Sequence, residues 1–263
     1  MKMTNKTSSY QKIKTRLFWV IVILVLWEIV AQSGIFPAAI FPSLLVIARA
    51  LENSIVSGEI LLQTAFSLAL ILQGFLISLL AAILVSSLAA GNKMFNGLVD
   101  TLAAIAHPLP GIALLPLIIV WFGTGTTSIL VIIVHSVIWP MILNIMTGFK
   151  AISPIYKEAG LNFGLNRFQI IKDILIPASL PYVLSGIRIG WARAWRALIS
   201  AEMIFGAVGL KGGLGWYIFK QRVFMDTPGM FAGIFVIVLI GIIVEDYVFA
   251  AFEERTVKKW GMI

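Results

Sequence analysis

Apolar residues along the chain gather into long runs separated by short polar segments. A transmembrane helix needs roughly 20 consecutive apolar residues. Runs that meet this requirement are predicted at 17–36, 62–89, 103–122, 127–148, 177–206 and 229–251. The pattern therefore predicts an all-α integral membrane protein of about six transmembrane helices, with a membrane domain at 17–252 between polar tails at 1–16 and 253–263.

The first run has two interpretations. Five basic residues and no acid precede it, which is also typical of a cleaved signal peptide. We favour a retained first span, because the run is long and Glu28 is followed by no clean small-residue cleavage site. The connection that follows, 37–60, is predicted to be external and to form a short interfacial helix.

Composition supports the membrane assignment. Of 263 residues, 60% are hydrophobic and only 12% are charged, which is more apolar surface than a soluble domain buries. The length fits one membrane domain with no appended ATPase domain. The net charge of +8 is scattered over the span ends instead of forming a basic stripe, so no nucleic-acid partner is expected. The absence of cysteine excludes a disulfide framework.

The basic residues also predict an orientation. With the N-terminus in the cytoplasm, the segments predicted to be inside carry thirteen lysines and arginines, and those outside carry four. Cytoplasmic loops are enriched in these residues. Both termini and the segment 153–177 are therefore predicted to be cytoplasmic.

Residues 153–177 carry their own helix signals. Ser153 before Pro154 is typical of a helix start, and Gly164 is typical of a helix end. Asn166 with Gln169 three residues later is a variant of the capping box that starts a second helix. We predict a helix–turn–helix in which each helix bears one apolar stripe. The stripes consist of Tyr156, Gly160 and Phe163, and of Phe168, Ile171 and Leu175.

This segment resembles the E-A-A-x3-G-x9-I-x-L-P signature of the permease subunits of bacterial ABC importers. In that family the loop is cytoplasmic and docks into a groove on the ATP-hydrolysing subunit. The resemblance implies that the matching residues contact this ATPase: Glu158, Ala159, Gly160, Gly164, Ile174, Ile176 and Pro177. Gly160 replaces the usual alanine and Ile176 the usual leucine. An amphipathic interfacial helix pair is the alternative, but it does not require Gly164 at this offset.

The resemblance implies a set of partners. These are a second copy of the chain, two ATP-binding cassette ATPase subunits, an extracytoplasmic solute-binding protein and the lipid of a bacterial cytoplasmic (inner) membrane. It also implies that the chain is no enzyme and holds no cofactor, because ATP and Mg would be bound by the ATPase.

Shorter motifs resemble one branch of the family. They are FPS at 41–43, HPLP at 107–110, LPL at 115–117, WFG at 121–123, GIR at 186–188, AWRAL at 194–198 and AEM at 201–203. That branch serves nitrate, sulfonate, taurine and bicarbonate importers, which implies a small anion as solute. A pyrimidine-precursor importer branch shares many of the motifs and is the alternative.

Two groups of residues are candidates for lining the solute pathway. Pro108 and Pro110 break a helix at membrane depth, which is tolerated where backbone is buried in protein or lines a cavity. Arg188, Arg196 and Glu202 are ionisable groups within the fifth span. Such groups usually face a bundle interior or a wet cavity, and the alternative is snorkelling or structural pairing of Glu202 with an arginine.

Other readings are less consistent with the residues. His107 and His135 have no acid or cysteine beside them, so no metal site is expected. The glycine-rich loop 206–215 fits neither phosphate-binding pattern and is predicted to be external. An intramembrane enzyme would require a nucleophile–base pair or a metal cluster. An ion-driven secondary transporter would require inverted repeats and midplane acids.

Overall fold

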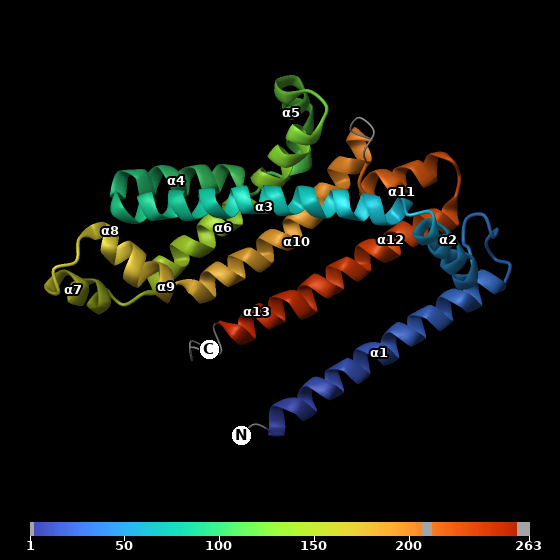
Figure 1. The fold of residues 1–263 in the computed structure, drawn as a ribbon, viewed down its shortest axis with the longest axis horizontal. Coiled ribbons are helices and arrows are strands. Elements are labelled where there is room, and N and C mark those ends of the chain that lie inside the picture. The colour runs from blue at the N-terminus through green and yellow to red at the C-terminus, as the bar shows by residue number, and fades with distance from the viewer. Residues whose placement is uncertain (1–2, 207–211, 257–263) are drawn as a thin grey trace. The chain divides into compact units, whose positions relative to one another are not determined.

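The computed structural model describes residues 3–206 and 212–256. Every regular element in this part of the chain is a helix (Figure 1), which confirms the predicted all-α fold. The chain divides into two units. Within the described residues, the first unit comprises 3–61 and 218–235, and the second comprises 62–206, 212–217 and 236–256.

Four helical segments are long and apolar enough to cross a membrane. They are Lys14–Gln32 of α1 (Met3–Gln32), α3 (Glu59–Gly91), α6 (Thr126–Ala151) and Thr227–Glu254, which runs through α12 (Thr227–Ile242), the π-helix η3 (Ile243–Val248) and α13 (Phe249–Arg255). Two bent pairs also qualify. Counting each pair as one span gives up to six, in agreement with the predicted number.

The predicted third span, 103–122, contains a sharp break and is preceded by more helix than the sequence predicted. α4 runs from Lys93 to Ala106, and its first turn is capped by Asn92, whose side chain accepts hydrogen bonds from two backbone N–H groups. The 3₁₀-helix η1 (Gly111–Leu114) and α5 (Leu115–Phe122) follow at a bend of 87° (Figure 1). Pro108 and Pro110 lie in the bend, where neither residue can donate a backbone hydrogen bond.

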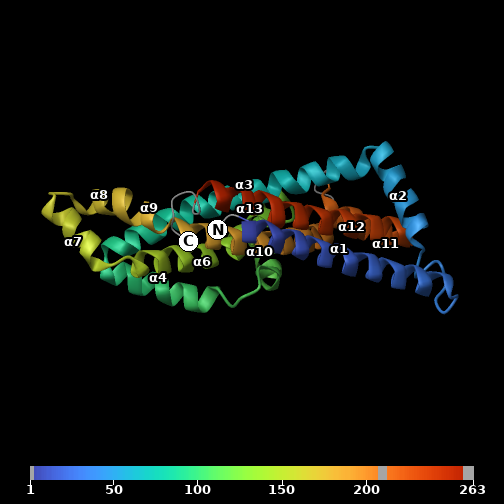
Figure 2. The ribbon, with the colours of Figure 1, turned by 90° about the horizontal axis from the view of Figure 1, so that it is seen from below.

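The second bent pair joins the loop 153–177 to the predicted fifth span, 177–206. α8 (Arg167–Gln169), the π-helix η2 (Ile170–Leu175) and α9 (Ile176–Ala178) form one arm. α10 (Leu180–Phe205) forms the other, at 67° to the first. α7 (Pro154–Asn162) precedes this pair, and together α7 to α9 form one end of the second unit (Figures 1 and 2).

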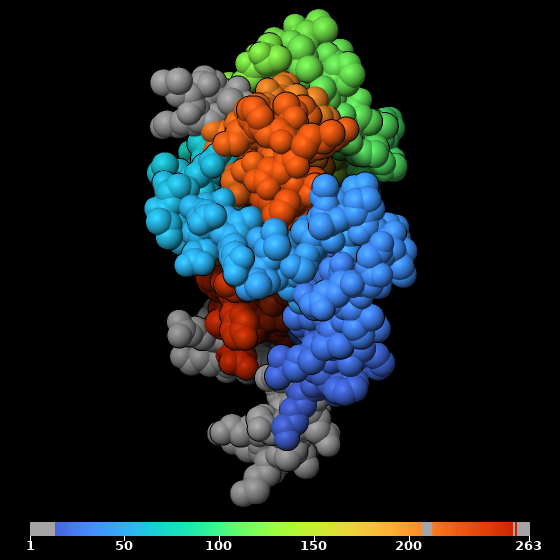
Figure 3. Space-filling view, turned by 90° about the vertical axis from the view of Figure 1, so that its right-hand side faces the viewer, coloured from blue at the N-terminus to red at the C-terminus, as the bar shows by residue number. Residues whose placement is uncertain are grey.

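In the first unit, hydrogen bonds and ring stacking connect α1 to α2 (Leu44–Val56) and to the residues just before it. Trp27 Nε1 donates to the carbonyl of Pro42 at 3.0 Å, and its ring stacks on Phe41 with centroids 4.0 Å apart. Glu28 Oε2 accepts a hydrogen bond from Leu44 N–H at 2.8 Å, which caps the first turn of α2. A helix within 37–60 is thus confirmed. Most side chains of residues 14–32 and of α2 are exposed or half-buried (blue in Figure 3).

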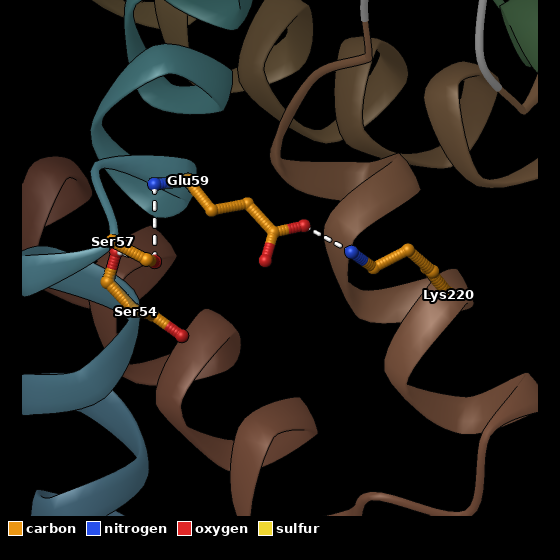
Figure 4. Close-up of polar contacts among 4 residues, drawn as sticks. All are labelled: Ser54, Ser57, Glu59 and Lys220. Carbon is orange, nitrogen blue, oxygen red and sulfur yellow. Dashed lines mark hydrogen bonds and ion pairs between the residues drawn. The ribbon is translucent and has the colours of Figure 1, made fainter.

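The first unit also holds an ion pair. The hydroxyl of Ser57 accepts from Glu59 N–H at 3.4 Å and donates to the carbonyl of Ser54 at 3.1 Å. The carboxylate of Glu59 pairs with Lys220 of α11 (Leu214–Val223), as Figure 4 shows. This pair links the start of α3 to α11 within the unit.

In the second unit, α6 and α10 form the most extensively packed pair of helices (Figure 1). Small residues allow the close approach: a methyl group at Gly186 would lie 3.0 Å from Asn144 Cβ, and one at Gly190 would lie 3.1 Å from Val137 Cγ1. The side of α6 that is buried carries Ile129, Ile132, Ile133, Val137, Met141, Ile142, Ile145 and Phe149. This core fixes the position of α10, which carries the candidate pathway residues.

Candidate functional site

The turn between α7 and α8 is built by local sequence signals. Gly164 has φ +79°, a value that side-chain-bearing residues rarely adopt. Leu165 N–H donates to the carbonyl of Gly160 at 3.0 Å, and Gly164 N–H donates to that of Leu161 at 2.9 Å. These two bonds define a Schellman motif, which ends α7 as the sequence predicted.

The second helix of the loop also begins as predicted. Asn166 Oδ1 accepts from Gln169 N–H at 2.9 Å, and Gln169 Oε1 accepts from Asn166 N–H at 2.8 Å. This reciprocal capping box is confirmed. At the start of α7, Pro154 occupies the first turn, but the side chain of Ser153 makes no capping hydrogen bond.

Two residues of the predicted ATPase contact, Gly160 and Ile174, pack against each other inside the loop. Gly160 is buried, and a methyl group there would lie 2.7 Å from Ile174 Cδ1. A side chain at position 160 would require the end of the Ile174 side chain to shift. Ile176 is half-buried, and the remaining members of the set are exposed on the surface of the loop: Glu158, Ala159, Gly164 and Pro177.

The apolar stripes of the two loop helices are buried only in part. Tyr156, Phe163 and Phe168 are 60%, 87% and 71% exposed. Gly160 and Leu175 are buried and Ile171 is half-buried, so each stripe has both buried and exposed members. Three aromatic side chains of the loop are therefore exposed, and we refer to these three residues together as the aromatic cluster.

A second feature lies at the bend between α4 and η1. An open cavity of about 580 Å³ is lined by residues of the bend and of α10. Pro108, Pro110 and Arg196, all predicted as pathway residues, line it together with Arg193. No acid occurs among its described lining residues. We call this cavity the bend cavity, and its positive lining suits an anion.

Histidine and arginine side chains in and near the wall of the bend cavity contact one another and the backbone. Arg193 Nη2 lies 3.3 Å from His107 Nε2, and His107 Nδ1 is buried with no hydrogen-bond partner among the described residues. Arg196 Nε donates to the carbonyl of Ala192 at 3.0 Å, which leaves its other N–H groups for a ligand. His135 Nε2 lies 3.2 Å from the carbonyl of Leu109. The sequence did not identify Arg193 as a pathway residue, because its contact with His107 joins residues that are 86 positions apart.

Comparison of the sequence with protein families identifies the family of this chain. The model of the binding-protein-dependent transport system inner membrane component matches residues 74–258. The chain belongs to this family. Its resemblance to ABC importer permeases is thereby confirmed, and the alternatives of an intramembrane enzyme and an ion-driven transporter are set aside. We refer to the chain below as the permease.

Curated relatives cover most of the permease. The putative aliphatic sulfonates transport permease protein SsuC of Bacillus subtilis is 27% identical over 91% of this chain and 84% of its own. The taurine transport system permease protein TauC of Escherichia coli is 28% identical over 86% and 82%. The formylaminopyrimidine transport permease protein ThiX of Halalkalibacterium halodurans is 29% identical over 89% and 91%.

The two other predicted pathway residues of the permease do not line the bend cavity. Arg188 Nη2 lies 3.5 Å from Glu245 Oε1, and both side chains are about half exposed. Glu202 is 1% exposed and lies in the interior of the second unit. Of the charged candidates, only Arg196 therefore remains at this cavity.

Glu202 joins three helices through hydrogen bonds. Its Oε1 and Oε2 lie 2.7 and 2.9 Å from Ser67 Oγ of α3, and Oε2 accepts from Gly215 N–H of α11 at 2.9 Å. Ser67 Oγ also accepts from Leu214 N–H at 2.9 Å. Glu202 therefore does not pair with an arginine among the described residues, the alternative considered for it, because the hydroxyl of Ser67 and the backbone N–H of Gly215 donate to its carboxyl group.

The glycine-rich loop of the permease, 206–215, is only partly described. Residues 207–211 lie outside the described residues. Gly206, with φ +73°, ends α10, and a methyl group at Gly213 would collide with the carboxyl group of Glu202. The glycine at 213 is therefore required for the close approach of this segment to Glu202.

Proposed function

We propose that the permease docks a separate ATP-hydrolysing subunit on the loop 153–177. The aromatic cluster is the observation that carries this proposal. Tyr156 and Phe163 lie outside the candidate membrane spans, and Phe168 lies at the start of the shorter arm of the second bent pair; all three side chains are exposed. Exposed apolar patches with a polar rim mark protein interaction sites. Glu158, exposed on the same helix as Tyr156, supplies a polar anchor.

The orientation follows from the same proposal. Docking of an ATPase requires the loop to face the cytoplasm, and the excess of lysine and arginine on that side supports this direction. Both termini then lie in the cytoplasm. ATP and Mg are bound by the partner, and this chain holds no cofactor.

The complete importer comprises two copies of the permease, two ATPase subunits and an extracytoplasmic binding protein that delivers the solute. Closure of the ATPase pair on ATP draws the two loops together. The rigid turn at Gly164 and the internal packing of Gly160 on Ile174 support transmission of this motion, because a loop that folds on itself moves as one body. The bend at Ser179 then passes the motion to α10.

The solute is a small anion of the sulfonate, taurine, nitrate or bicarbonate type. The bend cavity supports this choice, since Arg193 and Arg196 line it without an acid among the described lining residues. Arginine donors match the oxygens of such anions. SsuC and TauC are named for aliphatic sulfonates and taurine. A pyrimidine precursor is the alternative, supported by the similarity to ThiX, but the cations of the cavity favour the anion.

The docking proposal is tested by co-purification from detergent-solubilised membranes. The wild-type permease is expected to bring down an ATPase, scored as ATP hydrolysis in the eluate. Phe163→Ala is expected to lower the yield at least tenfold, because truncation of an aromatic side chain at the centre of an interface costs about 2 kcal/mol or more. The Glu158→Lys, Gly164→Asp double variant is expected to abolish it.

Val56→Ala is the matched control. Val56 is 83% exposed, nearly as much as Phe163, but it lies at the end of α2 in the first unit. Its truncation should leave the yield of ATPase unchanged. Equal yields from the wild type, Phe163→Ala and the double variant, all with the same elution volume, would show that the loop is not the docking element.

A further inference from the structure

A second cavity, distinct from the bend cavity, lies where α3 ends and α4 begins. It has a volume of about 700 Å³ and is also lined by the end of α6 and by α7, α8 and η2. We call it the basic cavity. Its side chains do not contribute to the aromatic cluster, and the proposed docking of an ATPase does not use it.

The lining of the basic cavity is strongly positive. Lys93, Lys150, Lys157 and Arg167 line it, and its described lining includes no acid. Lys150 Nζ lies 3.8 Å from Asp100 Oδ2, so this charge is partly compensated. In the described part of the chain, the other three cations have no acid within the distance of an ion pair. Three positive charges therefore line the cavity with no ion-pair partner among the residues that the structure describes.

Two polar groups inside the basic cavity also lack partners. Ser86 is fully buried, and its Oγ makes no hydrogen bond to any described residue. Asn96 Oδ1 is buried and likewise unpaired in the described structure. Buried polar atoms are paired in the great majority of cases. The serine can donate a hydrogen bond to an anionic oxygen, and the Asn96 oxygen can accept one from a hydroxyl.

The start of α4 adds to the positive potential. Asn92, which lines the cavity, caps this helix by accepting from Met94 N–H at 2.9 Å and from Phe95 N–H at 3.2 Å. The N-terminal end of a 14-residue helix carries a partial positive charge. Lys93 follows Asn92 directly, so the helix dipole and the lysine side chain both attract an anion.

The remaining wall of the basic cavity is apolar. Met146 and Phe149 of α6 and Ile170 and Leu175 of η2 line it, and all four are buried. A free inorganic anion would gain nothing from this wall. The cavity also lies at the ends of α3 and α6, both of which qualify as membrane spans, and the ends of spans lie at the depth of lipid headgroups.

We propose that the basic cavity binds a phosphate-bearing anion with a hydroxyl group and an apolar portion, of the class of phosphatidylglycerol. The cations and the hydroxyl of Ser86 hold the phosphate. The amide of Asn96 accepts from the glycerol hydroxyl, and the apolar wall contacts the start of an acyl chain. Basic pockets between membrane helices on the cytoplasmic side bind anionic headgroups by this combination.

The test is a lipid titration of the full-length permease purified in nonionic detergent, with the thermal unfolding midpoint followed by tryptophan fluorescence. Dioleoyl phosphatidylglycerol is expected to raise the midpoint saturably, and dioleoyl phosphatidylcholine is not. Lys157→Gln with Arg167→Gln should weaken the apparent affinity about fivefold for each removed cation. Ser86→Ala should weaken it further. The ATPase is absent from this assay, so its result is independent of the docking proposal.

Lys172→Gln is the matched control, because Lys172 is an exposed cation of the same loop that does not line the cavity. It should leave the affinity unchanged. Equal affinities for the two lipids, or equal loss in the control and the double variant, would overturn the proposal. A soluble arm uses glycerol 1-phosphate: binding as tight as that of the lipid, with the same sensitivity to the double variant, would keep the phosphate site and overturn the lipid as its occupant.

Discussion

Ser67→Ala is the substitution that best tests the packing of α10 against its neighbours. The hydroxyl of Ser67 donates to the carboxyl group of Glu202 and accepts from Leu214 N–H, and all three residues are buried. Alanine removes both interactions at once. It leaves a buried N–H without an acceptor and a buried carboxyl group with only Gly215 N–H as a donor among the described partners.

The size of the effect follows from these two losses. An unpaired buried donor costs about 1–3 kcal/mol, and a hydrogen bond to a charged group contributes about 1.5–3 kcal/mol. We expect a loss of about 3 kcal/mol in the free energy of unfolding. At roughly 2–4 °C per kcal/mol for a chain of this size, the unfolding midpoint should fall by about 6–12 °C.

Ser78→Ala provides the control on the same helix. Ser78 is also fully buried, but its hydroxyl donates only to the carbonyl of Gly74 one turn earlier, at 2.7 Å. That carbonyl belongs to the helix interior and keeps its backbone donor, so the loss should be about 1 kcal/mol or less. The midpoint should fall by no more than about 4 °C.

Tryptophan fluorescence during heating in detergent is the assay. The chain has eight tryptophans and no cysteine, so thiol-reactive dyes report nothing here. Trp191 and Trp195 lie on the buried side of α10 and respond to its release. Midpoints for Ser67→Ala and Ser78→Ala that agree within about 1 °C would refute the account of Glu202 as a buried junction of three helices.

Two further predictions concern the bend cavity and the turn of the loop. Arg196→Gln should raise the KM for uptake of an anionic solute about tenfold, because a charge-assisted hydrogen bond of about 1.5–3 kcal/mol is lost. Arg222→Gln, at an exposed arginine, should leave the KM unchanged. Unchanged uptake kinetics in Arg196→Gln would contradict the assignment of Arg196 to the pathway. Gly164→Ala should destabilise the permease by about 1–2 kcal/mol, because φ at this position is +79°. Gly97→Ala, in the interior of α4 with open space around it, should stabilise the permease by about 0.5–1 kcal/mol. Thermal unfolding midpoints of the two variants that shift in the same direction would contradict this reasoning.

The loop 153–177 was predictable because its signals are local. The Schellman turn at Gly164 and the capping box of Asn166 with Gln169 each depend on residues within six positions of one another. Burial was less predictable. Periodicity identifies an apolar face but not what covers it, and Phe163 is 87% exposed although it belongs to such a face.

The third span shows a different limit. Apolar composition is continuous over 103–122, and a hydropathy window therefore merges the last turn of α4 with η1 and α5. Pro108 and Pro110 indicated a break, but prolines within a span are compatible with either a kink or a full turn. The extent of the bend, 87°, depends on packing: a methyl group at Gly111 would lie 2.6 Å from Ser136 Oγ of α6.

Glu202 could not be assigned from the sequence, and the reason is general. A carboxylate in a membrane span suggests either a wet pathway or an ion pair, since both compensate its burial. The structure uses neither. Its partners are a serine 135 positions away and the first turn of another helix, whose unpaired N–H groups attract negative charge. Backbone donors have no signature in a sequence, so a helix start that receives a distant carboxyl group is visible only once the chain is folded.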